Sequence, residues 1–319
     1  MRKIAEKTTG RTRWLRALGL FTVGAIGTAA AISSVVIPLS SILIKPKLKR
    51  LHQLRSPLLE RFLKKKGYDF RSVSFRSYDG KLLHGWWSLK NPERPTIIVL
   101  HGVNGNRTSV IRFAMTLSQS GFNVLLFDWR AHGESEGDYV TYGYHERRDV
   151  LAAIDFLKQE FNIDADRIGL LGLSMGAAIA LQVAALNKTV KAVWADSPFA
   201  SLLRISTEVA TRVTGLPASI MSPLAKATFK VAGYRAGFDP TLVNPAEFAR
   251  KIRCPVVLVH GTDDELIPFN HSQIIYDELC SIEKELWIIE GAMHTTCFRK
   301  GGECYRQRLV DFFNRAFLH

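Results

Sequence analysis

The stretch Ile168-Gly-Leu-Leu-Gly172-Leu-Ser174-Met-Gly176-Ala-Ala-Ile-Ala-Leu-Gln-Val-Ala-Ala-Leu186 decides the fold of this 319-residue chain. Its first six residues are apolar or glycine, which is typical of a strand buried on both faces. A run of small residues that predicts a helix follows the serine. Glycines flank the serine in the pattern G-x-S-x-G, because a Cβ at either position would clash with the neighbouring strand and helix. The sequence therefore predicts a sharp strand-to-helix turn that exposes the Ser174 hydroxyl as a nucleophile.

Strands and helices alternate on both sides of this turn. The alternation predicts an α/β sheet that is mostly parallel, with an antiparallel hairpin leading in. The expected strands cover residues 71–78, 82–89, 96–100, 123–128, 168–173, 190–195, 256–260 and 284–289. The expected helices cover residues 106–120, 144–161, 175–186, 269–280 and 303–317. Residues 197–253 interrupt the alternation, and we expect them to form a small helical cap.

A serine nucleophile needs a base, and the base needs an acid that orients it. In a sheet of this kind the two follow the serine in the order acid then histidine, each just past a strand. The expected strand over residues 256–260 runs into Gly261-Thr-Asp-Asp264, and the strand over residues 284–289 runs into Glu290-Gly-Ala-Met-His294. Asp264 and His294 are therefore the predicted acid and base.

Other side chains compete for both roles. Asp263 and Asp196 remain alternative acids, although the first is typical of a solvated turn. His132 and His145 remain alternative bases, because both follow the strand over residues 123–128.

The remaining requirement is an oxyanion hole made by two backbone N–H groups. One should come from the residue after the nucleophile, Met175. The second is expected from Val103, in the loop His101-Gly-Val-Asn-Gly-Asn106. A plain strand-to-helix turn is the alternative reading of that loop.

Charge is distributed unevenly along the chain. Residues 1–66 hold 15 of the 43 Lys and Arg residues but two of the 29 Asp and Glu residues, a net charge of +13. The remainder has a net charge of +1. A near-neutral main domain argues against an extended phosphate-binding surface, so no nucleic-acid partner is expected.

No charged residue occurs from Ala17 to Ile44, a run of 28 residues. About 20 apolar residues cross a bilayer core, so we expect a single-pass N-terminal membrane anchor, with Pro38 as a candidate for its end. A cleaved signal peptide and a buried core helix are the alternatives. Six basic residues before the run and six after it leave the side of the catalytic domain open.

Residues 51–63 are expected to form a short amphipathic helix with an apolar stripe made by Leu51, Leu54, Leu58 and Phe62. Packing on the main domain and lying on anionic headgroups both remain open. The expected division of the chain is a basic segment with the anchor over residues 1–50, a linker helix over 51–66, and a catalytic domain over 67–319 that folds alone.

The four cysteines are expected to be free thiols, with a Cys297–Cys304 bridge as the alternative. The others are Cys254 and Cys280. No C-x-x-C pair occurs, which argues against a structural zinc site.

At these residues the chain resembles the α/β-hydrolase superfamily. It is most similar to the membrane-anchored bacterial branch grouped with serine aminopeptidase and monoacylglycerol-lipase-like hydrolases. The resemblance covers about residues 70–317 and rests on the turn at Ser174, His101 to Asn106, Asp128-Trp-Arg-Ala-His-Gly-Glu-Ser135, Asp196-Ser-Pro198, His260 to Pro268 and Gly291 to His294. It implies an α/β-hydrolase fold with an eight-stranded sheet, flanking helices and a cap. It also implies that the run Asp128–Ser135 is a structural loop near the site.

The expected function is that of a membrane-anchored serine hydrolase that cleaves small-molecule or lipid acyl esters without a metal or organic cofactor. A peptidase or amidase of the serine aminopeptidase type is one alternative. A non-catalytic membrane-tethered binding protein is another. Apolar cap residues are expected either to line an acyl site or to bury the cap's own core: Leu202, Leu203, Val209, Val213, Leu216, Ile220, Met221, Leu224 and Phe229. Oligomeric state stays open.

Overall fold

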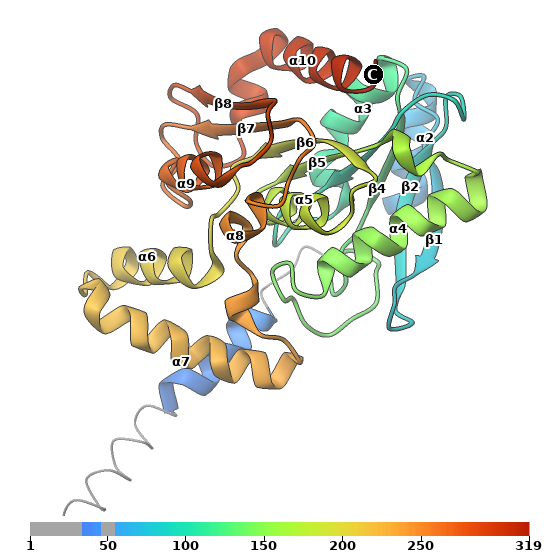
Figure 1. Cartoon of the computed structure of the whole chain (residues 1–319). Coiled ribbons are helices and arrows are strands. Elements are labelled where there is room, and N and C mark those ends of the chain that lie inside the picture. Colours follow the sequence, from blue (N-terminus) through green and yellow to red (C-terminus); the bar gives the residue numbers. More distant parts are fainter. Residues whose placement is uncertain (1–33, 46–54, 319) are drawn as a thin grey trace, which may run out of the picture.

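A computed structural model describes residues 34–45 and 55–318, and its centre is an eight-stranded sheet (Figure 1). The strand order is β1-β2-β4-β3-β5-β6-β7-β8. Strand β2 pairs antiparallel with β1 and β4, and all other pairs are parallel. The strands are β1 (Arg71–Arg76), β2 (Leu82–Ser88), β3 (Thr96–Leu100), β4 (Asn123–Phe127), β5 (Ile168–Leu173), β6 (Val190–Asp196), β7 (Val256–Gly261) and β8 (Lys284–Ile289). The predicted mostly parallel sheet with a leading hairpin is confirmed.

The central strands are apolar throughout because both faces of the sheet are covered. All five residues of β3 are buried. Ile98 and Leu100 contribute to the core on one face, and Ile97 and Val99 to the core on the other. This is the physical reason why the sequence shows continuous apolar runs instead of an alternating pattern.

Two layers of helices cover the sheet. On one face lie α4 (Glu146–Phe161), α5 (Met175–Leu186), α8 (Pro245–Ala249) and α9 (Asn270–Glu278). On the other lie α2 (Arg55–Lys65), α3 (Ile111–Gln119) and α10 (Cys297–Ala316). Gly302, with a φ of 54° and a ψ of −127°, interrupts α10, so the expected last helix follows this kink and the turns from Cys297 precede it. Short 3-10 turns complete the chain: η1 (Arg107–Val110), η2 (Ala165–Arg167) and η3 (Pro240–Leu242).

The cap insertion forms two long helices after β6, α6 (Leu202–Thr214) and α7 (Ala218–Ala236). Figure 1 shows them standing off the sheet, at the end of the molecule away from α10. Leu202, Met221 and Phe229 are buried, as expected of a core or a lining. The expectation is wrong for Val213, which is 79% exposed, and for two further residues, Leu216 and Ile220, that face solvent.

A helix over residues 34–44 lies against the cap. It continues through Pro38, which therefore does not end it. Arg235 of α7 donates hydrogen bonds to Ile37 O at 3.3 Å, Ser40 Oγ at 2.9 Å and Ser41 Oγ at 2.7 Å. Residues 17–33 of the predicted span over Ala17–Ile44 lie outside the described residues. Within residues 34–45 and 55–318, none of the helices combines the length and apolarity that crossing a bilayer requires.

The linker helix, α2, packs on the domain that follows it through Leu59 and Leu63. Leu63 is 2% exposed and Leu59 packs beside it, whereas Phe62 is 55% exposed. Leu51 and Leu54 lie outside the described residues. The division of the chain near residue 67 stays a prediction, but α2 and the helix over residues 34–44 both contact the unit that follows.

Candidate active site

Ser174 lies at the turn between β5 and α5, with a φ of 54° and a ψ of −116°. A Cβ at Gly172 would come within 2.3 Å of Gly176 O, and one at Gly176 within 2.3 Å of Leu100 O. Real side chains do not tolerate such contacts, so both positions require glycine. The positive φ at a non-glycine residue is a strained conformation that lifts the hydroxyl above the carboxyl edge of the sheet.

Three side chains form an unbroken hydrogen-bond chain at this edge. Ser174 Oγ lies 2.9 Å from His294 Nε2, and His294 Nδ1 lies 2.7 Å from Asp264 Oδ2. Ser174 is 6% exposed and Asp264 4%, whereas the His294 side chain retains 19% exposure. The arrangement makes His294 a base that can accept the serine proton while its other nitrogen donates to the carboxylate.

The Asp264 carboxylate is held by its own loop. Its Oδ1 accepts the amides of Leu266 at 3.1 Å and Ile267 at 2.9 Å, which leaves Oδ2 for the histidine. His260 Nε2 also lies 3.2 Å from Oδ2. Burial alone would raise the pKa of Asp264, but the hydrogen bonds from the two histidines and from Ile267 lower that pKa well below its ordinary value. The carboxylate therefore stays ionised.

The two alternative acids point elsewhere. Asp263 is exposed, and its carboxylate accepts a bond from Thr262. Asp196 is fully buried, and its carboxylate accepts the hydroxyls of Ser197 and Tyr305, each at 2.8 Å. Neither carboxylate has a hydrogen bond to His294 among the contacts of the described residues.

The two alternative bases are occupied in other contacts. His132 Nδ1 donates to Arg130 O at 2.8 Å, and its ring packs edge-on against His101. His145 bonds to Tyr78 Oη at 2.5 Å and to Gly237 O at 3.0 Å. Among the contacts of the described residues, neither ring has a hydrogen bond to Ser174, and His132 Nε2 is buried without a hydrogen-bond partner.

The predicted oxyanion loop follows β3 and lies against the nucleophile. A Cβ at Gly102 would sit 3.2 Å from Ser174 Cβ, so the loop backbone approaches the serine closely. Trp129 fixes the loop, because its Nε1 donates to His101 O at 2.8 Å and its amide donates to His101 Nε2 at 3.2 Å. Among the described residues, no backbone acceptor outside the helices and strands takes a hydrogen bond from the N–H groups of Met175 and Val103.

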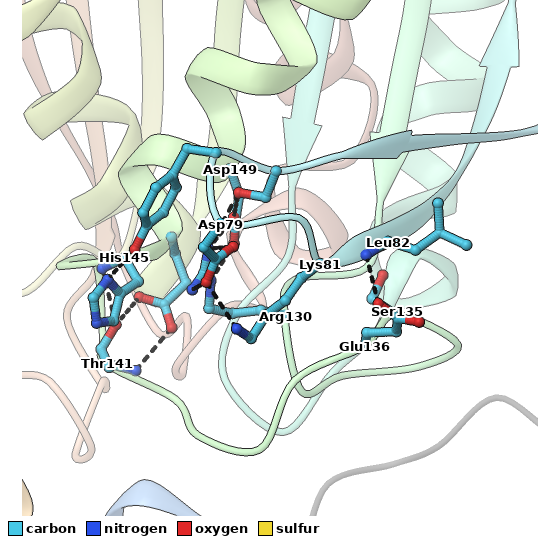
Figure 2. Close-up of polar contacts among 12 residues, drawn as sticks. Asp79, Lys81, Leu82, Arg130, Ser135, Glu136, Thr141, His145 and Asp149 are labelled. Atoms are coloured by element: carbon cyan, nitrogen blue, oxygen red, sulfur yellow. Dashed lines mark hydrogen bonds and ion pairs between the residues drawn. The ribbon is translucent and has the colours of Figure 1, made fainter. Parts of the chain in front are cut away.

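The loop over Asp128–Ser135 is held by ion pairs and hydrogen bonds, and Figure 2 shows those of Arg130 with Asp79 and Asp149. Arg130 donates to both Asp149 oxygens, at 2.8 and 2.6 Å, and to Asp79 at 3.1 Å. Arg107, which is 1% exposed, pairs with Asp128 and Glu134. Glu136, just past the loop, exchanges hydrogen bonds with Leu82 of β2. These contacts bind the loop to the first hairpin and to α4.

One group of supporting residues was not predicted. Ser174 N donates to Asp196 O at 2.8 Å, and Ser197 Oγ accepts the amide of Thr295, next to the base, at 3.4 Å. Ser197 and Thr295 both have a positive φ, of 57° and 56°. The run Asp196-Ser-Pro198 was part of the resemblance, but nothing in the residues indicated this contact.

No candidate metal site accompanies these groups. Among the described residues, no group of three or more His, Cys, Asp or Glu side chains could hold a metal ion. All four cysteines carry free thiols, so Cys297 and Cys304 are not bridged. Burial, with Asp196 nearby, raises the pKa of the Cys297 thiol, which keeps it protonated.

Comparison with known proteins gives a family match and two similar relatives. The family model described as "alpha/beta hydrolase fold" matches residues 95–218. The chain is 29% identical over 305 residues to the uncharacterized protein YqkD of Bacillus subtilis, covering 92% of this chain and 96% of that one. It is 30% identical over 253 residues to the uncharacterized protein YfhR of Escherichia coli, covering 77% and 81% respectively.

Solved structures include a similar esterase. The Pyrococcus furiosus esterase Pf2001 superposes with a TM-score of 0.68 and 26% sequence identity, covering 86% of this chain and 97% of that one. The chain therefore shares both the fold and much of the length of an esterase.

Proposed function

This chain belongs to the α/β-hydrolase superfamily, and we propose that it is a membrane-anchored serine hydrolase of carboxylic esters. The observation that carries the proposal is the hydrogen-bond chain from Ser174 through His294 to Asp264. It stands at the carboxyl edge of the sheet, on the strained turn where a nucleophile is most accessible. The likeness to an esterase supports the ester as substrate.

In the proposed mechanism, Ser174 Oγ attacks the acyl carbon while His294 Nε2 takes its proton. The Asp264 carboxylate orients the imidazole and stabilises the cation that forms. The N–H groups of Met175 and Val103 hold the developing oxyanion. His294 then gives its proton to the leaving alcohol, and a water that it activates hydrolyses the acyl-enzyme.

The membrane part of the proposal rests on the charge-free run from Ala17 to Ile44. A spanning helix is held by apolar burial, which salt does not screen. The full-length protein should therefore stay with membranes through a high-salt wash. Release by salt would contradict the anchor and favour a peripheral basic segment.

The experiment that tests the chemistry compares two matched chromogenic series. We expect turnover of p-nitrophenyl acyl esters and little turnover of aminoacyl p-nitroanilides, with chain-length preference reporting the space under the cap. The Ser174→Ala variant serves as the control for background hydrolysis. Faster turnover of the nitroanilides than of the esters would contradict the esterase assignment and favour a peptidase. If neither series were turned over, the alternative of a non-catalytic binding protein would be favoured.

A further inference from the structure

The helix over residues 34–44 has an apolar face that nothing in the described structure covers. Its buried face is formed by Val36, Ser40 and Ile44, which recur every four residues. Most of its remaining surface is apolar as well: Val35, Ile37, Leu39 and Ile42 are 40–63% exposed. A helix at a protein–water boundary normally carries polar residues on its outer face, so this outer face is built for an apolar surrounding.

The neighbouring cap helix, α7, exposes a stripe of a second kind. Its buried residues include Met221 and Phe229. Its exposed side presents Lys226, Lys230 and Tyr234, which follow one another every four residues, and Ile220 is exposed as well. Tyr234 is 93% exposed. The helix contains no acidic residue, so its three cations give it a net charge of +3. Cations interleaved with aromatic and apolar side chains are typical of helices that lie on anionic headgroups.

The two helices are in direct contact. Arg235, which follows Tyr234, donates to three oxygens of the helix over residues 34–44. Figure 1 shows both helices at the end of the molecule opposite α10. The charge-free run continues from residue 34 back to Ala17, and Lys45, Lys47 and Lys49 follow it. The apolar face thus adjoins the segment proposed as the anchor.

We propose that α7 and the helix over residues 34–44 form a docking surface for an anionic phospholipid bilayer. The apolar face of the shorter helix contacts the acyl region, and the cations of α7 contact the headgroups. Ile44 ends this helix in the same apolar cluster as Ala178, one turn past the nucleophile. Docking in this way sets the cap against the bilayer, so the substrate class is an ester of a membrane lipid. This last step rests on the proposed hydrolase function, whereas the docking itself does not.

The first test measures contact with lipid and needs no turnover. Single cysteines are introduced as Ile42→Cys, Tyr234→Cys and, as a control, Ile282→Cys, in a full-length chain in which Cys280 and Cys304 are replaced by serine. Ile282 is fully exposed and lies two residues before β8, a strand that Figure 1 shows away from both helices. Each is labelled with bimane in phosphatidylcholine–phosphatidylglycerol vesicles, with iodide on both sides of the bilayer. Iodide should quench the labels at 42 and 234 several-fold less than the label at 282.

Equal quenching at all three positions would overturn the docking surface. Protection that persists in detergent and grows with protein concentration would also overturn it, because that behaviour assigns the surface to a second copy of the chain. Protection of position 234 should fall when phosphatidylglycerol is omitted, since the cations of α7 then lose their partners.

The second test separates docking from chemistry. The double variant Lys226→Glu/Lys230→Glu should lose about tenfold or more in kcat/KM toward a long-chain ester carried in anionic vesicles, and little toward water-soluble p-nitrophenyl butyrate. Lys90→Glu/Lys188→Glu reverses two other exposed lysines and should change neither value. Equal losses on both esters, or none, would contradict the proposal. A wild-type chain inactive on both esters would instead contradict the hydrolase function, and the labelling result would still stand.

Discussion

Asp264 is oriented by its own loop as much as by its histidine partner. Two backbone amides hold one oxygen, and both His260 and His294 face the other. The neighbouring Asp263 has none of these contacts and is exposed. Of two adjacent aspartates in the sequence, one therefore contacts His294 and the other is an exposed turn residue.

Replacement of each aspartate by asparagine tests this distinction. Asp264→Asn should reduce kcat/KM by about 10³–10⁴-fold, because the imidazole loses the partner that fixes its tautomer. Asp263→Asn should have little effect and is the matched control. If the two effects were reversed, the acid would be Asp263. If neither variant were impaired, Asp196 would become the acid.

The same carboxylate makes stability depend on pH. Its pKa is lowered in the folded protein, so its contribution is fully present above the unfolded pKa of about 3.9 and is lost as the pH falls through the lowered value. Wild-type protein should therefore lose more unfolding free energy between about pH 5 and pH 2 than Asp264→Asn. Denaturant titrations of both proteins across this range measure the difference. Parallel curves would show that the carboxylate is not stabilised by its partners.

The residues of the hydrogen-bond chain could be predicted because each follows a recognisable strand in a fixed order. The support around them could not. The position of His260 beside Asp264 depends on how the loop after β7 folds back. The contact between Ser197 and Thr295 joins positions 98 residues apart in the sequence. A local sequence pattern cannot predict such a long-range contact.

At the level of elements, the strands were predicted well because continuous apolar runs require burial on both faces. For helix α2, the sequence left open which side packs on the rest of the domain. Its sequence pairs Leu58 with Leu59 and Phe62 with Leu63, so two adjacent stripes satisfy the helical period equally, and the contact with the sheet selects the second.

The helix over residues 34–44 contributes to the core of the hydrolase through Ile44. This side chain is fully buried with Phe229 of the cap, and Tyr142 Oη donates to the adjacent Leu43 O at 2.8 Å. Ile44→Ala should therefore destabilise the protein by about 2–5 kcal/mol, the cost of a cavity in a packed core. Thermal unfolding of the detergent-solubilised chain measures the effect.

Ile42→Ala is the matched control in the same helix. Because Ile42 is 63% exposed, the change should stay within about 0.5 kcal/mol in detergent. Equal effects of the two substitutions would mean that the helix does not pack on the cap as described.

At the scale of the whole molecule, the charge boundary near residue 67 and the packing boundary do not coincide. Charge divides the chain after the lysines of α2, but Leu63 and Ile44 lie in cores formed by later residues. Composition could predict the charge boundary because the net charge of a segment is the sum of its charged residues. It could not predict the packing boundary, since two buried leucine-sized side chains leave no compositional trace.

Truncation separates the two boundaries. Thermal midpoints should fall in the order of chains starting at residues 34, 55 and 67, because each step removes buried apolar side chains. The shortest chain should be the least stable, and the most prone to aggregate. If a chain of residues 67–319 matched the stability and ester turnover of the longest one, the N-terminal helices would be mere linkers and the charge boundary would be the true one.

The central claim is that Ser174 is an activated nucleophile, and the most direct measurement is labelling of the full-length protein with a fluorophosphonate probe followed by peptide mapping. The probe reacts with a serine whose proton is taken by a neighbouring base. We predict one adduct, on Ser174, that is lost in Ser174→Ala and strongly slowed in Asp264→Asn, with both variants folded. An adduct on another serine, or none on a folded wild-type chain, would contradict the account.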